Sequence, residues 1–216
     1  MKGIKMLISH KNRFIVLNIP KTGCNSRTFT FQKLGVIDVY GNGAIRTSTY
    51  LHSTLREIAH YHFQTDVYFS YYKWAMVRNP WRRYVSILQY NLGVISDKSH
   101  PDHAGMINWW NKCNTNEHNA LKNIILYHGK PQVEFLVNDT GDIVVDHIAR
   151  FENINLEHDM FCKKVNIQPT PTLKHTNKSP NVHNKSYKEF YTQELVDLVA
   201  EREKGILSIT EYQYEN

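Results

Sequence analysis

Residues 14–29 read FIVLNIPKTGCNSRTF, and this stretch sets the fold that the rest of the chain must complete. Its first half belongs to a short apolar run, rich in β-branched residues, that predicts a buried strand over 13–19. Pro20 ends that run, and residues 25–34 carry the pattern of a helix with Phe31 and Leu34 on one face. A loop that joins a strand to the start of a helix presents backbone N–H groups and the positive end of the helix dipole. We therefore predict that the loop at 20–26 binds an anion.

The side chains of this loop are those that a phosphate or sulfate group needs. Lys21 supplies a mobile positive charge, Thr22 and Ser26 supply hydroxyl donors, and Gly23 lets the backbone approach a ligand closely. The Walker A loop, G-x-x-x-x-G-K-[ST], does not occur, because the lysine here precedes the glycine. A nucleotide kinase or triphosphatase is thereby disfavoured. A plain surface turn with an ordinary lysine remains the alternative.

Strands and helices alternate along the rest of the chain. YKWAMV at 72–77 predicts a second buried strand, and Asn79 and Pro80 suit the cap and the first position of a helix over 79–92. The other expected elements are a helix at 50–62, a hairpin-like pair and then a strand within 133–152, a helix at 153–165, a loop at 168–187 and a helix at 188–204. This order predicts an α/β fold with a central, mostly parallel sheet flanked by helices.

The composition is that of a folded protein with anionic partners. Of the 216 residues, 41% are hydrophobic and 21% are charged, and the formal net charge is +6. That balance favours nucleic acid, phosphorylated cofactors or acidic glycans without choosing among them. The three cysteines form no C-x-x-C pair, and we find neither an apolar signal segment nor a run of about 20 apolar residues. We expect a soluble, cytoplasmic protein without a membrane span.

A second anion-type element follows the strand at 72–77. Arg78 stands at the end of that strand, and a guanidinium there can meet a phosphate through two parallel hydrogen bonds. Ser86 lies about two turns into the following helix and can add a hydroxyl. For Arg82 we favour the plainer interpretation of a solvated or ion-paired residue in the first turn. Ligands of parallel sheets bind beyond the carboxyl ends of the strands, where both loops fall, so the two loops together are more informative than either alone.

Both elements resemble motifs of sulfotransferases that use 3′-phosphoadenosine 5′-phosphosulfate (PAPS). IPKTGCNS at 19–26 is similar to their 5′-phosphosulfate loop, and VRNPWRRYVSIL at 77–88 is similar to their 3′-phosphate motif. Three further segments resemble the carbohydrate branch of the family, which includes heparan-like, chondroitin-like and bacterial-type sulfotransferases. They are YLHSTLREI at 50–58, VDHIARFENI at 145–154 and KHTNKS at 174–179. The similarity runs in order over nearly the whole chain and implies a single P-loop-like domain over 1–216.

The resemblance implies transfer of a sulfuryl group from PAPS to a hydroxyl of a carbohydrate or similar acceptor, with no metal. Lys21 would stabilise the leaving phosphate, while Arg78 and Ser86 would hold the 3′-phosphate. The remaining residues that would contact the cofactor are Thr22, Gly23, Cys24, Asn25, Ser26, Asn177, Lys178 and Ser179. Cys24 and Asn25 stand where the family usually has Gly and Thr, so the cysteine adds bulk at a point of close approach.

His52 is the candidate base that would deprotonate the acceptor. An imidazole titrates near neutral pH, and His52 matches the histidine of the carbohydrate-type segment. Glu57 is the fallback base, and packing or helix capping is the plainer interpretation of His52. The histidine pairs at 60 and 62 and at 100 and 103 have no third ligand nearby, so we expect no metal site. Residues 93–118 are a loop-rich insertion and the possible acceptor region.

Two functions from other classes stay open at this point. The basic charge would also suit a non-catalytic binder of nucleic acid or acidic polymer, but no zinc finger, RNP motif or Lys/Arg-rich run occurs, so we expect no nucleic-acid partner. A phosphoryl-transfer enzyme is disfavoured because the Walker A loop and an evident Mg²⁺-binding acid are missing.

Overall fold

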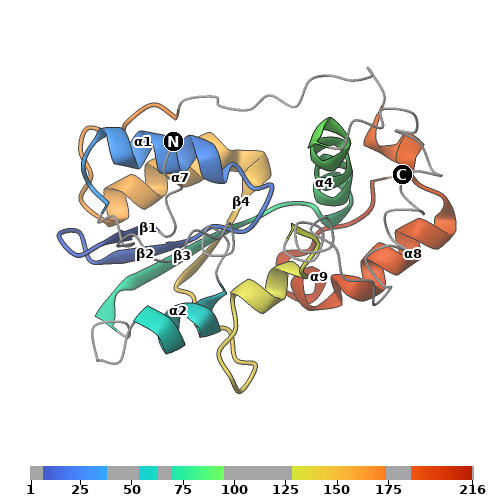
Figure 1. Ribbon diagram of the computed structural model, residues 1–216, viewed down its shortest axis with the longest axis horizontal. Helices are drawn as coiled ribbons and strands as arrows, with labels where there is room; N and C mark the ends of the chain where they lie inside the picture. Colours follow the sequence, from blue (N-terminus) through green and yellow to red (C-terminus); the bar gives the residue numbers. More distant parts are fainter. Residues whose placement is uncertain (1–6, 38–53, 63–69, 95–127, 174–185, 216) are drawn as a thin grey trace. The chain divides into compact units, whose positions relative to one another are not determined.

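The computed structural model describes residues 7–37, 54–62, 70–94, 128–173 and 186–215 (Figure 1). The chain divides into two compact units. The sheet unit is Met1–Val77 with Val133–Thr176, and the helical unit is Arg78–Gln132 with Asn177–Asn216. That the whole of 1–216 forms a single domain stays a prediction.

The sheet unit is built on four strands in the order β1-β2-β3-β4. They are β1 (Leu7–Ser9), β2 (Phe14–Leu17), β3 (Tyr72–Val77) and β4 (His147–Arg150). β1 pairs antiparallel with β2, whereas β2 with β3 and β3 with β4 are parallel pairs. β2 and β3 are almost entirely buried, as expected for apolar strands covered on both faces. The predicted α/β fold with a mostly parallel sheet is therefore confirmed.

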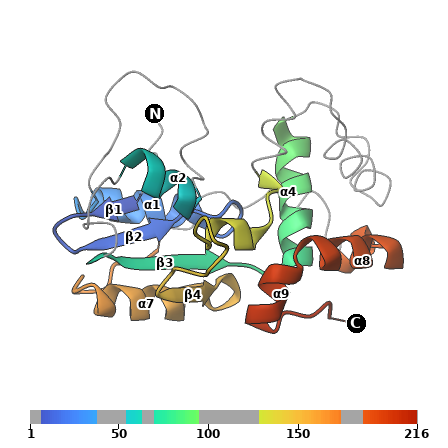
Figure 2. The ribbon, with the colours of Figure 1, turned by 90° about the horizontal axis from the view of Figure 1, so that it is seen from below.

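Helices cover both faces of this sheet. α1 (Cys24–Lys33) and α7 (Ile154–Lys164) lie side by side on one face, and α2 (Leu55–His62) lies on the other (Figures 1 and 2). The core between α1, α7 and the sheet is aromatic. The ring centroid of Phe161 lies 5.0 Å from that of Trp74 and 5.8 Å from that of Phe31. Burying each such side chain contributes about 1.5–3 kcal/mol, so this cluster fixes α1 against the strands.

Local structure departs from the sequence prediction in three places of the sheet unit. β1 was not expected, because three residues are too short to show a period. Residues 133–152 contain less strand than predicted: η2 (Gln132–Phe135) is a 3₁₀ turn, and only Val137 and Ile143 form an isolated bridge before β4. Leu34 follows the last residue of α1 as its C-cap and is 46% exposed, so it does not share the buried face of Phe31.

The helical unit contains α4 (Pro80–Val94), η4 (Tyr187–Phe190), α8 (Gln193–Arg202) and α9 (Lys204–Thr210). The Asn79 side chain caps α4 as predicted, because its Oδ1 accepts a hydrogen bond from the backbone N–H of Arg82 at 3.3 Å. The helix predicted over 188–204 was wrong at its start. A capping box at Ser186 starts η4 as a separate turn, and Thr192 caps α8 by accepting a hydrogen bond from the N–H of Leu195.

Candidate functional site

The predicted anion loop at 20–26 lies just after β2, at the edge of the sheet where the parallel strands have their carboxyl ends. Leu17 is the last residue of β2 and pairs with Ala75, two residues before β3 ends at Val77. Arg78 is the next residue of the chain after Val77. This edge is where open α/β sheets bind their ligands, so the predicted anion loop starts from the expected place.

Two residues with left-handed backbone shape the loop. Lys21 has φ 70° and Gly23 has φ 77°, and α1 begins directly after Gly23. A Cβ on Gly23 would come within 2.9 Å of Ile154 Cδ1 and 3.2 Å of Phe151 Cε2, so any other residue would displace these side chains as well as strain the backbone. A left-handed residue next to a right-handed helical one turns backbone N–H groups toward one point, which is an arrangement that binds anions.

The start of α1 is left without a negative group of its own. Its N-cap residue, Gly23, has no side chain that could cap the helix, and the first turn contains no acidic residue. The positive end of the helix dipole is thus not offset by the helix itself. Together with the left-handed turn before it, this end of α1 has the properties of an anion-binding helix N-terminus.

The side chains of Thr22 and Cys24 face the interior of the loop. Thr22 Oγ1 and Cys24 Sγ each donate a hydrogen bond to the carbonyl oxygen of Ile19, at 2.8 Å in both cases. Thr22 is fully buried and Cys24 is 5% exposed. The bulk of Cys24 therefore packs behind the loop instead of toward a ligand. The prediction that these two residues cradle an anion can rest only on their backbone N–H groups.

The other loop residues keep their side chains accessible. Asn25 is exposed, and Lys21 and Ser26 are half-buried. These three are thus the loop residues whose side chains could reach a ligand from solvent.

Arg27 is the residue that the sequence interpretation missed. Its guanidinium is buried and lies 5.2 Å from the centroid of the Trp74 ring. Nη1 donates to the Thr22 carbonyl at 2.6 Å, and Nη2 donates to Thr22 Oγ1 at 3.4 Å. Burial lowers the pKa of Arg27, while Cys24 acts in the opposite direction. The helical period could have placed it, because Arg27 and Phe31 share the buried face of α1.

The second predicted element, 78–86, belongs to the helical unit. Arg78 is half-buried, and Ser86 is 8% exposed on α4. Arg82 pairs with Glu215 and its guanidinium lies 4.7 Å from the Tyr187 ring centroid, which confirms the interpretation of Arg82 as an ion-paired residue. The structure shows Arg78 to be fixed by its backbone, since both its N–H and its C=O bond to the side chain of Gln132.

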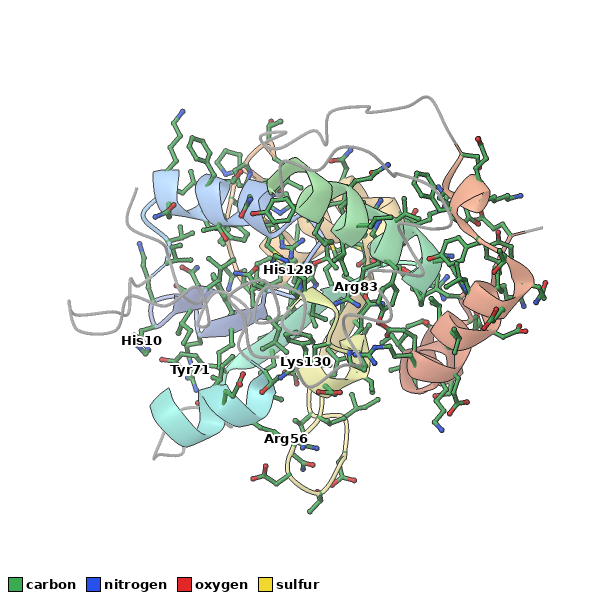
Figure 3. All side chains as sticks on the ribbon, turned by 45° about the vertical axis from the view of Figure 1, so that its right-hand side comes forward. His10, Arg56, Tyr71, Arg83, His128 and Lys130 are labelled. Carbon is green, nitrogen blue, oxygen red and sulfur yellow. The ribbon has the colours of Figure 1, made fainter. Side chains whose placement is uncertain are left out.

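Arg83 differs from Arg82 because it is completely buried. Its Nη1 donates to Glu203 Oε1 at 2.9 Å, and both side chains have no exposed area. Nη2 also donates to the carbonyl oxygens of His128 and Lys130, and Figure 3 shows these two residues beside Arg83. Burial raises the pKa of Glu203, and the positive charge of Arg83 acts in the opposite direction. The pair ties the segment at 128–132 to α4 and to the junction of α8 and α9.

Glu57 has a structural role in the sheet unit. Its carboxylate accepts hydrogen bonds from the backbone N–H of Thr54 at 2.7 Å and from the Thr54 hydroxyl at 3.1 Å. The N–H of Glu57 donates in return to Thr54 Oγ1, which completes a capping box at the start of α2. A carboxylate held in this way is a poor candidate for the fallback base.

Several predicted site residues lie outside the described residues. They are His52, Asn177, Lys178 and Ser179. Most of the 93–118 insertion lies outside them as well. In the segments that are described, no three metal-ligating side chains come together. No helix in those same segments combines the length and the apolar character needed to cross a bilayer.

Comparison with known protein families places the chain in one of them. A model of a sulfotransferase family matches residues 5–208, which is nearly the whole chain. No curated protein and no solved structure matches the sequence significantly.

Proposed function

The chain belongs to the sulfotransferase family, and from that premise we propose that it moves a sulfuryl group from PAPS to a hydroxyl of a carbohydrate or a similar acceptor. The family consists of PAPS-dependent transferases, so the chain is an enzyme with a nucleotide donor and a hydroxyl-bearing acceptor. This membership sets aside the alternative of a non-catalytic binder that uses a basic surface. The acceptor class and the roles of individual residues are our proposal.

The observation that carries the proposal is the turn before α1. Left-handed residues at 21 and 23, a helix start without an acidic residue in its first turn and the accessible side chains of Lys21, Asn25 and Ser26 suit the doubly charged 5′ end of the donor. In the helical unit, Arg78 and Ser86 are the residues that we assign to the 3′-phosphate. The late-loop residues Asn177, Lys178 and Ser179 are assigned to the same nucleotide by resemblance alone.

Lys21 is the residue that we assign to the chemical step. When bound, PAPS supplies the sulfuryl group and a phosphate as the leaving group. Negative charge then grows on the oxygen that bridges sulfur and phosphorus, and a cation held there lowers the barrier more than it tightens substrate binding. The Lys21 ammonium has the charge and the accessible position for this task. Arg27 stabilises the loop that contains Lys21 through its hydrogen bond to the Thr22 carbonyl.

His52 is the proposed base for the acceptor hydroxyl. The support is its match to the carbohydrate-type segment and the engagement of the competing carboxylate, Glu57, in capping α2. A neutral imidazole can take a proton from a hydroxyl near pH 7, and such a base contributes about 10²–10⁴-fold to the rate. No step in this scheme needs a metal ion.

Binding measurements test the nucleotide assignment. We expect the wild-type protein to bind 3′-phosphoadenosine 5′-phosphate, the desulfated product, more tightly than AMP or ATP with Mg²⁺ in isothermal titration calorimetry. Arg78→Ala should remove that preference, and Lys130→Ala, from the same unit, serves as the charge-matched control. Equal affinity of the wild type for all three nucleotides would count against the proposed site.

Incubation with radiolabelled PAPS and a panel of glycans tests the acceptor class. Transfer of label to a polysaccharide or oligosaccharide supports a carbohydrate acceptor. Transfer only to small phenols or alcohols would keep the sulfotransferase assignment and overturn the carbohydrate proposal.

A further inference from the structure

The side chain of Gln132 is bonded to the backbone of Arg78 at both polar atoms. Gln132 Oε1 accepts from the Arg78 N–H at 2.9 Å, and Gln132 Nε2 donates to the Arg78 carbonyl oxygen at 2.9 Å. Gln132 is completely buried. Arg78 follows β3 and precedes α4, so it lies outside the regular hydrogen bonding of both elements. The primary amide thus supplies the pair of hydrogen bonds that a neighbouring strand would otherwise provide.

Gln132 is itself held in place by the buried ion pair. Its backbone N–H donates to Glu203 Oε2 at 3.0 Å, while Glu203 Oε1 accepts from Arg83. Arg83 lies in the first turns of α4, and its N–H donates to the Asn79 carbonyl at 2.9 Å. The connections therefore run from Arg78 through Gln132 and Glu203 to Arg83, and return along α4 to the residue next to Arg78. Neither Gln132 nor Glu203 needs to touch a ligand to exert an effect there.

We propose that Gln132 is a positioning residue that sets the preference of this enzyme for a 3′-phosphorylated nucleotide. The inference rests on the proposed function, in which the Arg78 guanidinium meets the 3′-phosphate. A guanidinium binds a phosphate well only when its planar fork is correctly aimed, and the start of its side chain is fixed by the backbone that Gln132 holds. Without Gln132 the Arg78 backbone would be more mobile in the free protein, and binding of the 3′-phosphate would have to order it at a cost in conformational entropy. That cost lowers the affinity for the 3′-phosphate and leaves the contacts to the rest of the nucleotide unaffected.

Gln132→Met tests this inference because it keeps the length and most of the volume of the side chain while removing both hydrogen bonds. Isothermal titration calorimetry should measure the dissociation constants of 3′-phosphoadenosine 5′-phosphate and of AMP. We expect the affinity for the 3′-phosphorylated nucleotide to fall about tenfold, the scale set by one or two hydrogen bonds, and the affinity for AMP to stay the same. In the Arg78→Ala background, Gln132→Met should cause no further loss.

Two variants separate positioning from loss of stability. Tyr84→Phe removes the hydroxyl that donates to the Gly129 carbonyl at 3.1 Å, so it loosens the same segment without touching Arg78. We expect it to keep the ratio of the two affinities. Gln132→Asn retains the amide but has a shorter reach. If Gln132→Met does not fold, a lower ratio in Gln132→Asn supports the inference.

The outcomes are distinguishable from those of the proposed function. If the wild type prefers the 3′-phosphorylated nucleotide and the folded Gln132 variants keep that preference, the positioning role is wrong and the enzyme assignment stands. If the wild type shows no preference, the 3′-phosphate site and the role of Gln132 fall together.

Discussion

Arg27 donates a hydrogen bond from Nη1 to the carbonyl oxygen of Thr22 across 2.6 Å, and this bond fastens the anion loop to the helix that follows it. The same nitrogen lies 2.9 Å from the sulfur of Met76 on β3. Among the residues that the structure describes, the contacts of Arg27 are with a carbonyl, a hydroxyl, two sulfur atoms and an aromatic ring, and none is with a carboxylate. Within the described part of the chain, the loop is therefore backed by a positive charge that has no acidic side chain as its partner.

Replacing Arg27 by Met should weaken binding of 5′-phosphorylated nucleotides. The variant loses the bond to Thr22 and the buried charge, so we expect the affinity for AMP to fall about tenfold. Calorimetry with AMP measures this loss. Arg56→Met is the matched control, because Arg56 belongs to the same unit but is exposed and bonds to the Asn138 carbonyl. Wild-type affinity in Arg27→Met would show that the loop does not need this support.

Gly23→Ala should destabilise the fold more than Gly35→Ala. Both glycines have positive φ, which costs an alanine about 1–2 kcal/mol. Only Gly23 adds a steric clash, since its Cβ would meet Ile154 and Phe151, whereas nothing lies within 4 Å of a Cβ at Gly35. Urea denaturation of the two variants measures the difference. Equal free energies of unfolding would mean that the Ile154 side chain of α7 moves away from the added Cβ without loss of stability.

Lys21→Ala should lower kcat by about 10²–10³-fold, the scale on which other enzymes respond to the loss of one donor that stabilises a developing oxyanion. Affinity for PAPS itself should change much less, because the charge on the bridging oxygen develops only during transfer, whereas the desulfated product already carries it. Single-turnover rates with PAPS measure the first effect and calorimetry the second. Lys33→Ala, at the other end of α1, is the control. A drop in affinity as large as the drop in rate would assign Lys21 to binding alone.

His52→Ala should keep nucleotide affinity and lose turnover by about 10²–10⁴-fold. The wild-type rate should rise with pH as the imidazole becomes neutral, and the variant should lack that rise. A pH profile of kcat/KM with an excess of acceptor distinguishes the two. Normal turnover in His52→Ala would remove this histidine from the mechanism.

Glu203→Gln should unfold more easily than the wild type by about 3–5 kcal/mol, because it leaves the Arg83 guanidinium buried without its counter-charge. Glu201→Gln, which removes an exposed pair with Lys204, should have a much smaller effect, because solvent screens that pair. Chemical denaturation followed by circular dichroism measures both. Similar small effects in the two variants would mean that the 128–132 segment rearranges to solvate Arg83.

The sequence was a good guide to elements that depend on local patterns. β3 and the cap and start of α4 lie where an apolar run and an Asn-Pro pair predicted them. The roles of Arg27 and Gln132 were not foreseen. Gln132 lies 54 residues from Arg78 and Glu203 lies 120 residues from Arg83, and no local period reports a hydrogen bond over such a separation. The motif also could not predict the side-chain direction of Cys24, because it records the residue type but not the hydrogen-bond partner, which is the Ile19 carbonyl.

The shared acceptor of Thr22 and Cys24 has a consequence for redox behaviour. In the loop motif that residues 19–26 resemble, the position of Cys24 is usually glycine, and a thiol facing the donor would expose catalysis to alkylation and to oxidation by peroxide. Here the sulfur is turned toward the Ile19 carbonyl and is almost fully shielded from solvent. Cys24 should therefore resist alkylation by iodoacetamide in the folded enzyme, and mass spectrometry of the treated protein would show this residue unmodified.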